Sequence, residues 1–471
     1  MKKIALALVL ALPFSVSAAT IAIVDSGSDF KHKDLAPQYQ VNEKETAENK
    51  VDDDANGYID DVYGFNLFEK NGEVIDYSYL EKLKPSMADI HKFFEIQVRL
   101  LDKTASDNDK MWMKAIKTDE IFMKNLQIFG NFAHGTHVAG ISAGFSSSVE
   151  MENRPFALKI IPTEVKLPFS VMYSTSDSFR TLVNSAKTGI PVSLRVLGLE
   201  LGLRFLAKQQ TKVFGEIGKY VNARGADVAN GSFGTGYAQL HTIVEMLYNM
   251  IIKEDERDKD QVDELTRGYA QQILINAREM PLAAPKTLFV FAAGNDGANN
   301  DELPCSPANL REDNTITVAA TLRNRELASF SNFGMRKVDV AAPGVGIHSL
   351  YPGDDHGLMS GTSQAAPYVT YVAAMVKNQN PALTPSQIKF LLMETVDAKE
   401  WLADKVKSSG FVNPDRAREA ALLSKAMPLH EAIVAARSRV KDLKVEETPT
   451  KTEEEKSEQD IVIVPLVSPI N

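Results

Sequence analysis

The chain has 471 residues, of which 44% are hydrophobic and 24% charged, and its formal net charge is −10. This composition is typical of a globular protein with one large domain and some additions, and the negative charge disfavours nucleic acid or an anionic membrane as a partner. The single cysteine, Cys305, excludes an intrachain disulfide and argues against a zinc site built from thiolates.

Residues 1–19 have the pattern of an export signal. The basic pair Lys2-Lys3 precedes an apolar run over 4–14, and small residues ending at Ala18 follow. The run is too short to span a membrane, and no other stretch is a transmembrane candidate. We therefore expect a mature chain that is periplasmic or secreted.

The stretch 21–24, Ile-Ala-Ile-Val, predicts a strand buried on both faces of a parallel sheet. Asp25 follows it directly, at the carboxyl end of the strand, where α/β sheets place their chemistry. For this stretch alone, a turn aspartate before a glycine would be the favoured interpretation.

A dense acidic loop covers residues 52–61 and opens like a calcium-binding loop, with a glycine at the sharp turn. The candidate calcium ligands are Asp52, Asp54, Asn56 and Asp60. Tyr63 stands where a complete EF-hand has its bidentate glutamate, so the loop is not an EF-hand. Two interpretations stay open, a structural Ca²⁺ ion or an acidic turn without an ion.

Residues from about 69 to 128 have a helical, amphipathic pattern and predict an inserted helical segment on the surface. The small and apolar residues after His134 predict a tightly packed helix whose first turn carries that histidine. His137 lies one turn further on. No acidic residue stands between the two histidines, so we interpret His137 as a structural histidine and not as a metal ligand.

Strands and helices alternate along the rest of the chain. Strands are predicted at 156–165, 226–230, 287–293, 315–320 and 338–342. Helices are predicted at 202–221 and over a segment that ends near residue 396. A second helical insertion is predicted at about 237–280. Thr384 is the expected N-cap of the helix that ends near residue 396, with Pro385 in its first turn. This alternation predicts an α/β fold with a doubly wound, mostly parallel sheet and helices on both faces.

The character of the sequence changes towards the end. Residues 417–445 are predicted to be a helical extension, and 446–471 an acidic low-complexity tail with an apolar end. The Glu/Lys/Thr/Ser tract has little to bury and predicts disorder. The apolar end is of a kind that can add as an edge strand, here or on a partner.

Ser363 stands in the stretch 360–367, Ser-Gly-Thr-Ser-Gln-Ala-Ala-Pro, just before an apolar, alanine-rich helix. A turn of this kind exposes a hydroxyl beside the free N–H groups of a helix N-terminus. Taken alone, such a stretch is more often an ordinary N-cap. A catalytic interpretation also needs a base, a buried carboxylate and an oxyanion donor, and the chain offers His134, Asp25 and Asn295.

The local contexts of these four residues resemble those of the subtilisin-like serine proteases, or subtilases. They are Ile-Val-Asp-Ser-Gly around Asp25, His-Gly-Thr-His-Val-Ala-Gly from His134, Ala-Ala-Gly-Asn-Asp-Gly around Asn295 and Ser-Gly-Thr-Ser-Gln-Ala-Ala-Pro around Ser363. Their order, Asp, His, Ser, is also that of subtilisin. The resemblance implies a peptidase domain over residues 20–416, interrupted by the two insertions.

The resemblance implies an exported serine endopeptidase that needs no cofactor for its chemistry. Ser363 would be the nucleophile, His134 the general base and Asp25 the residue that orients the imidazole. The oxyanion would lie between the side chain of Asn295 and the backbone N–H of Ser363.

The resemblance also implies how a peptide or protein substrate binds. The substrate would lie as an extended strand along Ser232-Phe233-Gly234, and Ala292-Ala293-Gly294 would help to form the pocket for the residue before the cut. Cys305 either lies near the wall of that pocket or is a plain buried thiol.

Two features depart from the family pattern. The family usually has an N-terminal propeptide, whereas the strand that bears Asp25 starts almost at the predicted cleavage site. We hypothesise that the helical insertion or the tail restrains the enzyme instead. Gly231 stands where the family generally has a larger apolar residue, which leaves open what packs behind the substrate edge.

Two other hypotheses stay open. One is a catalytically idle relative that serves as a binding or scaffold protein, which typically lacks one member of the triad. The other is a calcium-stabilised surface protein whose acidic loop is its main feature. The natural substrate and the oligomeric state are not specified by any motif.

Overall fold

The computed structural model describes residues 18–145, 153–164 and 189–444. Most of the predicted export signal and the whole predicted tail at 446–471 lie outside these residues. Within them, a ten-stranded sheet forms the centre of the molecule, with the order β11-β12-β8-β6-β5-β4-β1-β3-β2 and with β7 paired to β6. The strands are β1 Thr20–Asp25, β2 Gly64–Asn66, β3 Arg154–Lys159, β4 Val228–Gly231, β5 Leu288–Ala292, β6 Thr315–Leu322, β7 Glu326–Leu327, β8 Val340–Pro343, β11 Asp397–Ala398 and β12 Gly410–Phe411.

The sheet is parallel from β2 to β12, and only the short strands β7 and β11 pair antiparallel to their neighbours. The central strands β4, β5 and β6 are buried along their whole length. A parallel strand is buried on both faces when helices cover both sides of the sheet. This confirms the predicted α/β fold with a mostly parallel sheet.

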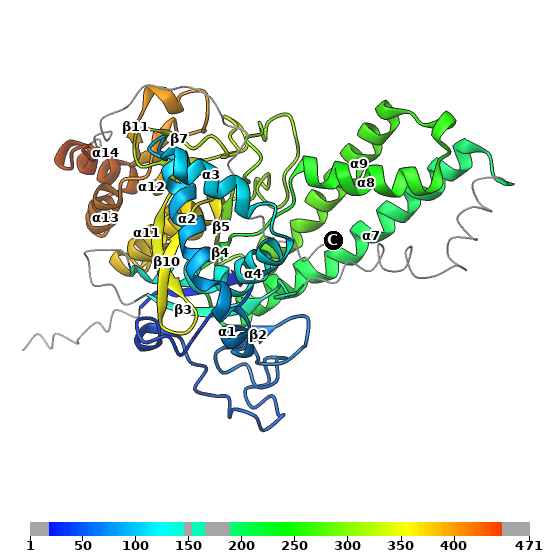
Figure 1. Cartoon of the computed structure of the whole chain (residues 1–471). Coiled ribbons are helices and arrows are strands. Elements are labelled where there is room, and N and C mark those ends of the chain that lie inside the picture. The colour runs from blue at the N-terminus through cyan, green and yellow to red at the C-terminus, as the bar shows by residue number, and fades with distance from the viewer. Residues whose placement is uncertain (1–17, 146–152, 165–188, 445–471) are drawn as a thin grey trace, which may run out of the picture.

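The helices connect these strands and cover the sheet (Figure 1). They are α1 Ser78–Leu83, α2 Met87–Leu101, α3 Asp107–Ile116, α4 Glu120–Ala143, α7 Val192–Ala223, α8 Tyr237–Ile251, α9 Lys259–Ala277, α10 Glu279–Ala283, α11 Thr362–Gln379, α12 Pro385–Glu394, α13 Pro414–Leu423 and α14 Leu429–Arg439. Thr384 caps α12 as predicted, and it forms a capping box with Gln387. Within the described ranges, each helix is either too short or too polar to span a lipid bilayer.

The prediction for the helix that carries His134 was wrong. His134 does not lie in the first turn, because α4 begins at Glu120 and runs without a break to Ala143. The first half of α4 packs with α2 and α3 around a hydrophobic cluster of its own, which includes Phe93, Phe129 and Tyr351. The helical segment inserted before His134 is therefore continuous with the helix that carries this histidine.

Two further helical regions differ in their placement. The helices α7, α8 and α9 pack on one another and extend away from the sheet (Figure 1). In contrast, α13 packs against α11, and buried alanines such as Ala417 and Ala420 belong to the main hydrophobic core. Chain segments after residue 413 thus contribute to the same core as the central strands.

A β-hairpin between β8 and α11 was not predicted from the sequence. Its strands are β9 Ile347–Tyr351 and β10 Asp355–Met359, and they pair antiparallel outside the main sheet. The hairpin packs on α4 through β9 and on α2 through β10. It leads directly into Ser360 and the start of α11, so its position fixes where that helix begins.

Candidate active site

Asp25 is the last residue of β1 and is fully buried. It pairs in register with Lys159 of β3, while its neighbour Val24 pairs with Gly231 of β4. Because parallel strands end at the same edge of a sheet, Asp25 and the residue after Gly231, Ser232, lie side by side, with the strands about 4.8 Å apart. This edge is where the predicted site residues meet.

His134 donates a hydrogen bond from Nδ1 to Oδ1 of Asp25 over 2.8 Å. The same carboxylate oxygen accepts the backbone N–H of Ser26 over 2.7 Å, which fixes the orientation of the carboxylate. A proton on Nδ1 leaves Nε2 of His134 unprotonated, and Nε2 is the atom that can accept a proton from a nucleophile. The structure therefore brings Asp25 and His134 together in the geometry of an oriented base.

Glycine allows α4 to approach the loop after β1 closely enough for this contact. A β-carbon on Gly135 would collide with the carbonyl oxygen of Gly27, and Gly27 itself has a φ of 96°. The N–H of Gly135 donates to the hydroxyl of Ser26 over 3.1 Å. The two glycines and Ser26 thus set the distance between the helix and the carboxylate.

Ser363 is the second residue of α11, whose N-cap is Gly361. Its hydroxyl donates to the carbonyl oxygen of Ser232 over 3.2 Å, and the hydroxyl of Ser232 donates back to the carbonyl oxygen of Ser363 over 2.8 Å. Ser363 is thereby held on the strand next to Asp25. In the structure its hydroxyl faces the Ser232 carbonyl and forms no hydrogen bond with His134.

Asn295 follows β5 and is oriented by Thr362. Its side-chain oxygen accepts the backbone N–H of Thr362 over 2.8 Å and the Thr362 hydroxyl over 2.9 Å. Because the amide oxygen is engaged by these two donors, Nδ2 must point the other way. A β-carbon built on Gly361 would lie 2.9 Å from Oε1 of Gln364, 3.5 Å from Nδ2 of Asn295 and 3.6 Å from the backbone nitrogen of Ser363. Both nitrogens therefore flank one small space beside Gly361, which a side chain there would fill.

The predicted substrate-binding residues lie at the same edge. Ser232 and Phe233 are buried, and Gly234 is half-buried. Beyond them, Thr235 forms an antiparallel bridge with Ser306. Segment 232–234 is thus held at both ends, by β4 on one side and by this bridge on the other.

Ala292 and Ala293 are buried at the end of β5, and Gly294 turns the chain with a φ of 111°. Behind Gly231 the ring of Phe291 fills the space, since a β-carbon on Gly231 would lie 2.6 Å from that ring. The ring of Phe291, on the neighbouring strand, therefore fills the volume that a larger side chain at position 231 would take.

Cys305 lines a hollow of about 150 Å³, together with residues that include Tyr237, Asp296 and Leu303. The cysteine is nevertheless buried, and burial, with a smaller contribution from the charge of Asp296, raises the pKa of its thiol to about 12. The interpretation of Cys305 as a plain buried thiol agrees with its burial, and its place at the wall of the substrate pocket stays a prediction. Cys305 is an inert thiol at the wall of a hollow.

His137 is buried one turn after His134. Its Nε2 lies 3.1 Å from the carbonyl oxygen of Ile347 and 3.3 Å from that of Gly357, so it ties α4 to both strands of the hairpin. Burial, and then the nearby His134, lower the pKa of His137 to about 3, which keeps it neutral at ordinary pH.

Sequence reasoning missed several residues that position the site. Asp29 accepts the hydroxyl of Tyr77 over 2.6 Å and the backbone N–H of Gly353 over 2.9 Å, and it thereby joins the loop after Asp25 to α1 and to the hairpin. Thr362 stands in the stretch around Ser363, next to the proposed nucleophile. Its polar neighbours lie far away in the sequence, so no local spacing could have indicated its role.

The acidic loop gathers only part of the predicted calcium set. The carboxylates of Asp52 and Asp54 meet that of Glu45, which was not predicted, with oxygen atoms within 4.8 Å of one another. Asp60 instead accepts the backbone N–H groups of residues 49 and 50. Asn56 directs its side-chain nitrogen towards Asp61. These three grouped carboxylates fit the oxygen ligands that calcium prefers, and burial raises the pKa of Glu45.

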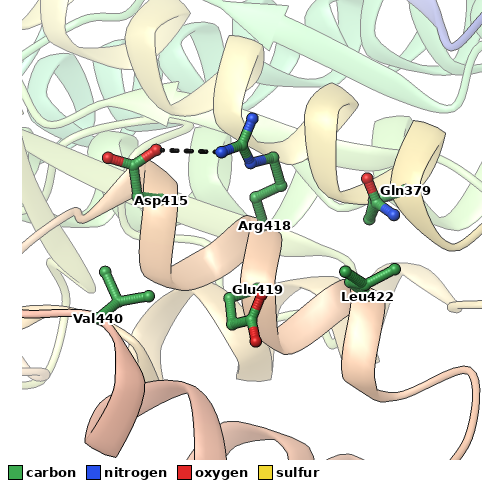
Figure 2. Close-up of a pocket in the computed structure, with 6 residues that line it drawn as sticks. All are labelled: Gln379, Asp415, Arg418, Glu419, Leu422 and Val440. Carbon is green, nitrogen blue, oxygen red and sulfur yellow. Dashed lines mark ion pairs between the residues drawn. The ribbon is translucent and has the colours of Figure 1, made fainter.

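A separate surface hollow of about 300 Å³ lies between the end of α11, α13 and the end of α14 (Figure 2). It is lined by Gln379, Asp415, Arg418, Glu419, Leu422 and Val440. Asp415 and Arg418 form an ion pair over 3.6 Å on one side of it. It shares no lining residue with the site around Asp25 and His134.

Comparison with known proteins identifies the family. The profile of the Subtilase family matches residues 17–421. Subtilisin BL of Lederbergia lenta is 38% identical over 130 residues, which are 28% of this chain and 45% of that protein. Subtilisin-like protease 1 of Plasmodium vivax is 25% identical over 419 residues, which are 88% of this chain and 49% of that protein. The chain thus spans about half the length of these curated relatives.

Among solved structures, a cold-adapted subtilisin-like serine proteinase is similar, with 18% identity and a TM-score of 0.39, over 83% of this chain and 88% of that one. The family profile covers most of the chain, including the sheet, α4, α7 and α11. The chain belongs to the subtilase family.

Proposed function

We propose that this protein is a serine endopeptidase in which Ser363, His134 and Asp25 form the catalytic triad. The observation that carries the proposal is the 2.8 Å hydrogen bond between His134 Nδ1 and the buried carboxylate of Asp25, at the sheet edge where Ser363 is held by Ser232. Membership of the subtilase family supports the same reaction class.

In the proposed reaction, Oγ of Ser363 attacks the carbonyl carbon of the scissile peptide bond while Nε2 of His134 takes the hydroxyl proton. The tetrahedral intermediate collapses, His134 gives that proton to the leaving amine, and an ester to Ser363 remains. Water, deprotonated by His134, then attacks the ester and releases the acid, and the proton returns to Ser363. Asp25 keeps the proton on Nδ1 and stabilises the imidazolium while Nε2 is protonated.

The oxyanion of each tetrahedral intermediate would accept hydrogen bonds from Nδ2 of Asn295 and the backbone N–H of Ser363. The proposal is supported by the two donors that flank the same space beside Gly361 and by the two hydrogen bonds that orient Asn295. Oriented donors of this kind stabilise the charge that develops in the transition state without having to reorganise.

The substrate would bind as an extended strand along residues 232–234. Its side chain before the cut would lie against Ala292, Ala293 and Gly294, near the hollow beside Cys305. A peptide that adds to a free strand edge gains backbone hydrogen bonds whatever its sequence, so the pocket must supply the selectivity.

A fluorophosphonate probe tests the proposal directly. We expect one label per folded chain on Ser363, no label on Ser363→Ala, and hydrolysis of labelled casein by the unmodified chain only. A folded chain that neither takes the probe nor cleaves casein would instead be a catalytically idle binding or scaffold protein.

We also propose that the protein is exported, with cleavage near residue 19. Sequencing the N-terminus of protein recovered from outside the cytoplasm should give Ala19 or Thr20. Recovery of the uncleaved chain in the cytoplasm alone would contradict this.

We further propose that Glu45, Asp52 and Asp54 hold one structural Ca²⁺ ion. Removal of calcium should then lower the melting temperature, and added Ca²⁺ should restore it. In Asp52→Asn the calcium response should be lost, whereas an unchanged response in that variant would reject this ligand set.

A further inference from the structure

A second group of metal-ligating side chains lies outside the proposed peptidase site, where the loop after β1 meets strand β10 of the hairpin. It consists of His32, Asp34 and His356, and we call it the hairpin cluster. One ligand atom from each residue lies within 4.8 Å of the other two. Nε2 of His356 is 2.9 Å from Oδ2 of Asp34, and Nδ1 of His32 is 3.9 Å from the same oxygen.

The tautomer of His32 is set by its surroundings. Nε2 donates to the carbonyl oxygen of Asp355 over 3.1 Å, so Nδ1 carries the lone pair that faces the cluster. Metal-binding histidines usually donate their other ring nitrogen to a carbonyl or a carboxylate in this way. The ring is fully buried and cannot turn freely. In the structure, the backbone N–H of Asp34 donates a hydrogen bond to Nδ1 of His32 over 3.2 Å, and a bound ion would replace this hydrogen bond.

The neighbouring charges favour a cation. Oδ1 of Asp354 lies 4.0 Å from Nδ1 of His32 and accepts the backbone N–H of Lys33 over 2.7 Å. The carboxylate of Asp355 faces the other way and pairs with His91 over 2.8 Å. A second carboxylate close to the cluster lowers the cost of bringing a divalent charge there.

The donor set decides which ions fit. Two imidazole nitrogens and one carboxylate oxygen suit zinc and similar divalent transition metals, whereas calcium and magnesium prefer oxygen ligands only. Ligands of a four-coordinate zinc ion lie about 2 Å from the metal and so roughly 3.3 Å from one another, and the separations of 2.9 Å and 3.9 Å from Oδ2 of Asp34 to the two histidines are close to that.

We propose that the hairpin cluster binds one divalent transition-metal ion of the zinc class, with Nδ1 of His32, Oδ2 of Asp34 and Nε2 of His356 as ligands and water in the fourth position. This site is independent of the proposed peptidase chemistry. The ion would join the loop that follows Asp25 to the strand that leads to Ser363. We therefore assign it a stabilising role.

Zinc titration of the Ser363→Ala chain tests the proposal, since this substitution prevents self-digestion. The protein is stripped with EDTA and returned to buffer with excess Ca²⁺, which occupies any all-oxygen site. Calorimetry should then give one Zn²⁺ per chain, and the melting temperature should rise with Zn²⁺. Co²⁺ bound in the same site should show the visible absorption of a four-coordinate ion.

Two ligand variants and two controls locate the ion. His356→Gln, whose amide can still donate to Asp34, and Asp34→Asn should each weaken Zn²⁺ binding at least about tenfold. His430→Gln, at an exposed histidine on α14, and Asp52→Asn, in the acidic loop, should bind as the parent does. Melting temperatures in EDTA check that each variant is folded.

The proposal is overturned if no one-to-one binding is seen, or if the ligand variants bind Zn²⁺ as tightly as His430→Gln. It is also overturned if Asp52→Asn alone abolishes binding, which would place the ion in the acidic loop. Because the readouts are metal affinity and stability in an inactive chain, failure here is independent of the outcome of the fluorophosphonate test.

Discussion

Thr362 donates two hydrogen bonds to the side-chain oxygen of Asn295, one from its backbone N–H over 2.8 Å and one from its hydroxyl over 2.9 Å. The Thr362 hydroxyl also accepts the backbone N–H of Gly294 over 3.2 Å. The residue immediately before the proposed nucleophile therefore sets the direction of the proposed oxyanion donor. Because Thr362 is bonded to Ser363 in the chain and hydrogen-bonded to Asn295, it holds the proposed nucleophile and the proposed oxyanion donor in a fixed relation to each other.

The first prediction concerns that donor. Asn295→Ala should lower kcat by about 10²–10³ and leave KM nearly unchanged, because the lost hydrogen bond forms in the transition state and not with bound substrate. In subtilisin, the loss of such an asparagine costs about 2.7–4 kcal/mol. Steady-state kinetics on a peptide substrate measure the effect, with the exposed Asn108→Ala in α3 as the control. An unchanged kcat would remove Asn295 from the oxyanion site.

The second prediction concerns the inserted helices. Phe129 is 2% exposed, and its ring meets that of Tyr351 edge-on with centroids 5.0 Å apart. Phe129→Ala should reduce the free energy of unfolding by about 3–5 kcal/mol. Ile121→Ala on the same helix, where the side chain is 76% exposed, should change it by less than about 0.5 kcal/mol. Urea unfolding of both variants in the Ser363→Ala chain measures this, and equal effects would contradict the packing described for α4.

The third prediction is a pH dependence of stability. The pKa of His137 is lowered to about 3 by burial and by His134, against 6.5 for an ordinary histidine. Between these pH values the unfolded chain binds a proton that the native chain does not, so the contribution of His137 is fully present above pH 6.5 and is lost as the pH falls. The loss approaches about 1.4 kcal/mol per pH unit.

His137→Gln keeps a donor for the hairpin carbonyls but does not titrate. Urea unfolding between pH 7 and pH 4.5 should therefore give a shallower fall in stability for this variant than for the parent. His430→Gln, at an exposed position, should follow the parent. Parallel curves for His137→Gln and the parent would show that His137 is not held neutral.

The fourth prediction concerns the only cysteine of the chain. With the pKa of Cys305 raised to about 12, about one thiol in ten thousand is ionised at pH 8. Iodoacetamide should leave the native protein unmodified and add one group per chain in denaturant, as mass spectrometry would show. Equal labelling of native and denatured protein would contradict the burial of this thiol.

The sequence alone was enough for the strand that ends at Asp25, the parallel α/β architecture and the cap at Thr384, because each depends on a local pattern of apolar residues or on a single capping side chain. The order of Asp25, His134 and Ser363 likewise indicated the family. Only the tertiary structure decided where the helix of His134 begins. Gly130 and Asn131 have low helix propensity, yet both are buried inside α4, where packing against the inserted helices outweighs that propensity.

The tertiary structure alone also revealed the contacts of the β9–β10 hairpin. In the hairpin cluster, His356 of the hairpin lies beside His32. Carbonyl oxygens of the hairpin also accept from His137. Each of these contacts joins residues that are more than two hundred positions apart in the chain. Hydrophobic periodicity tells which face of an element is buried but not which distant segment covers it. Side chains that meet through such contacts leave no spacing in the sequence by which they could be recognised.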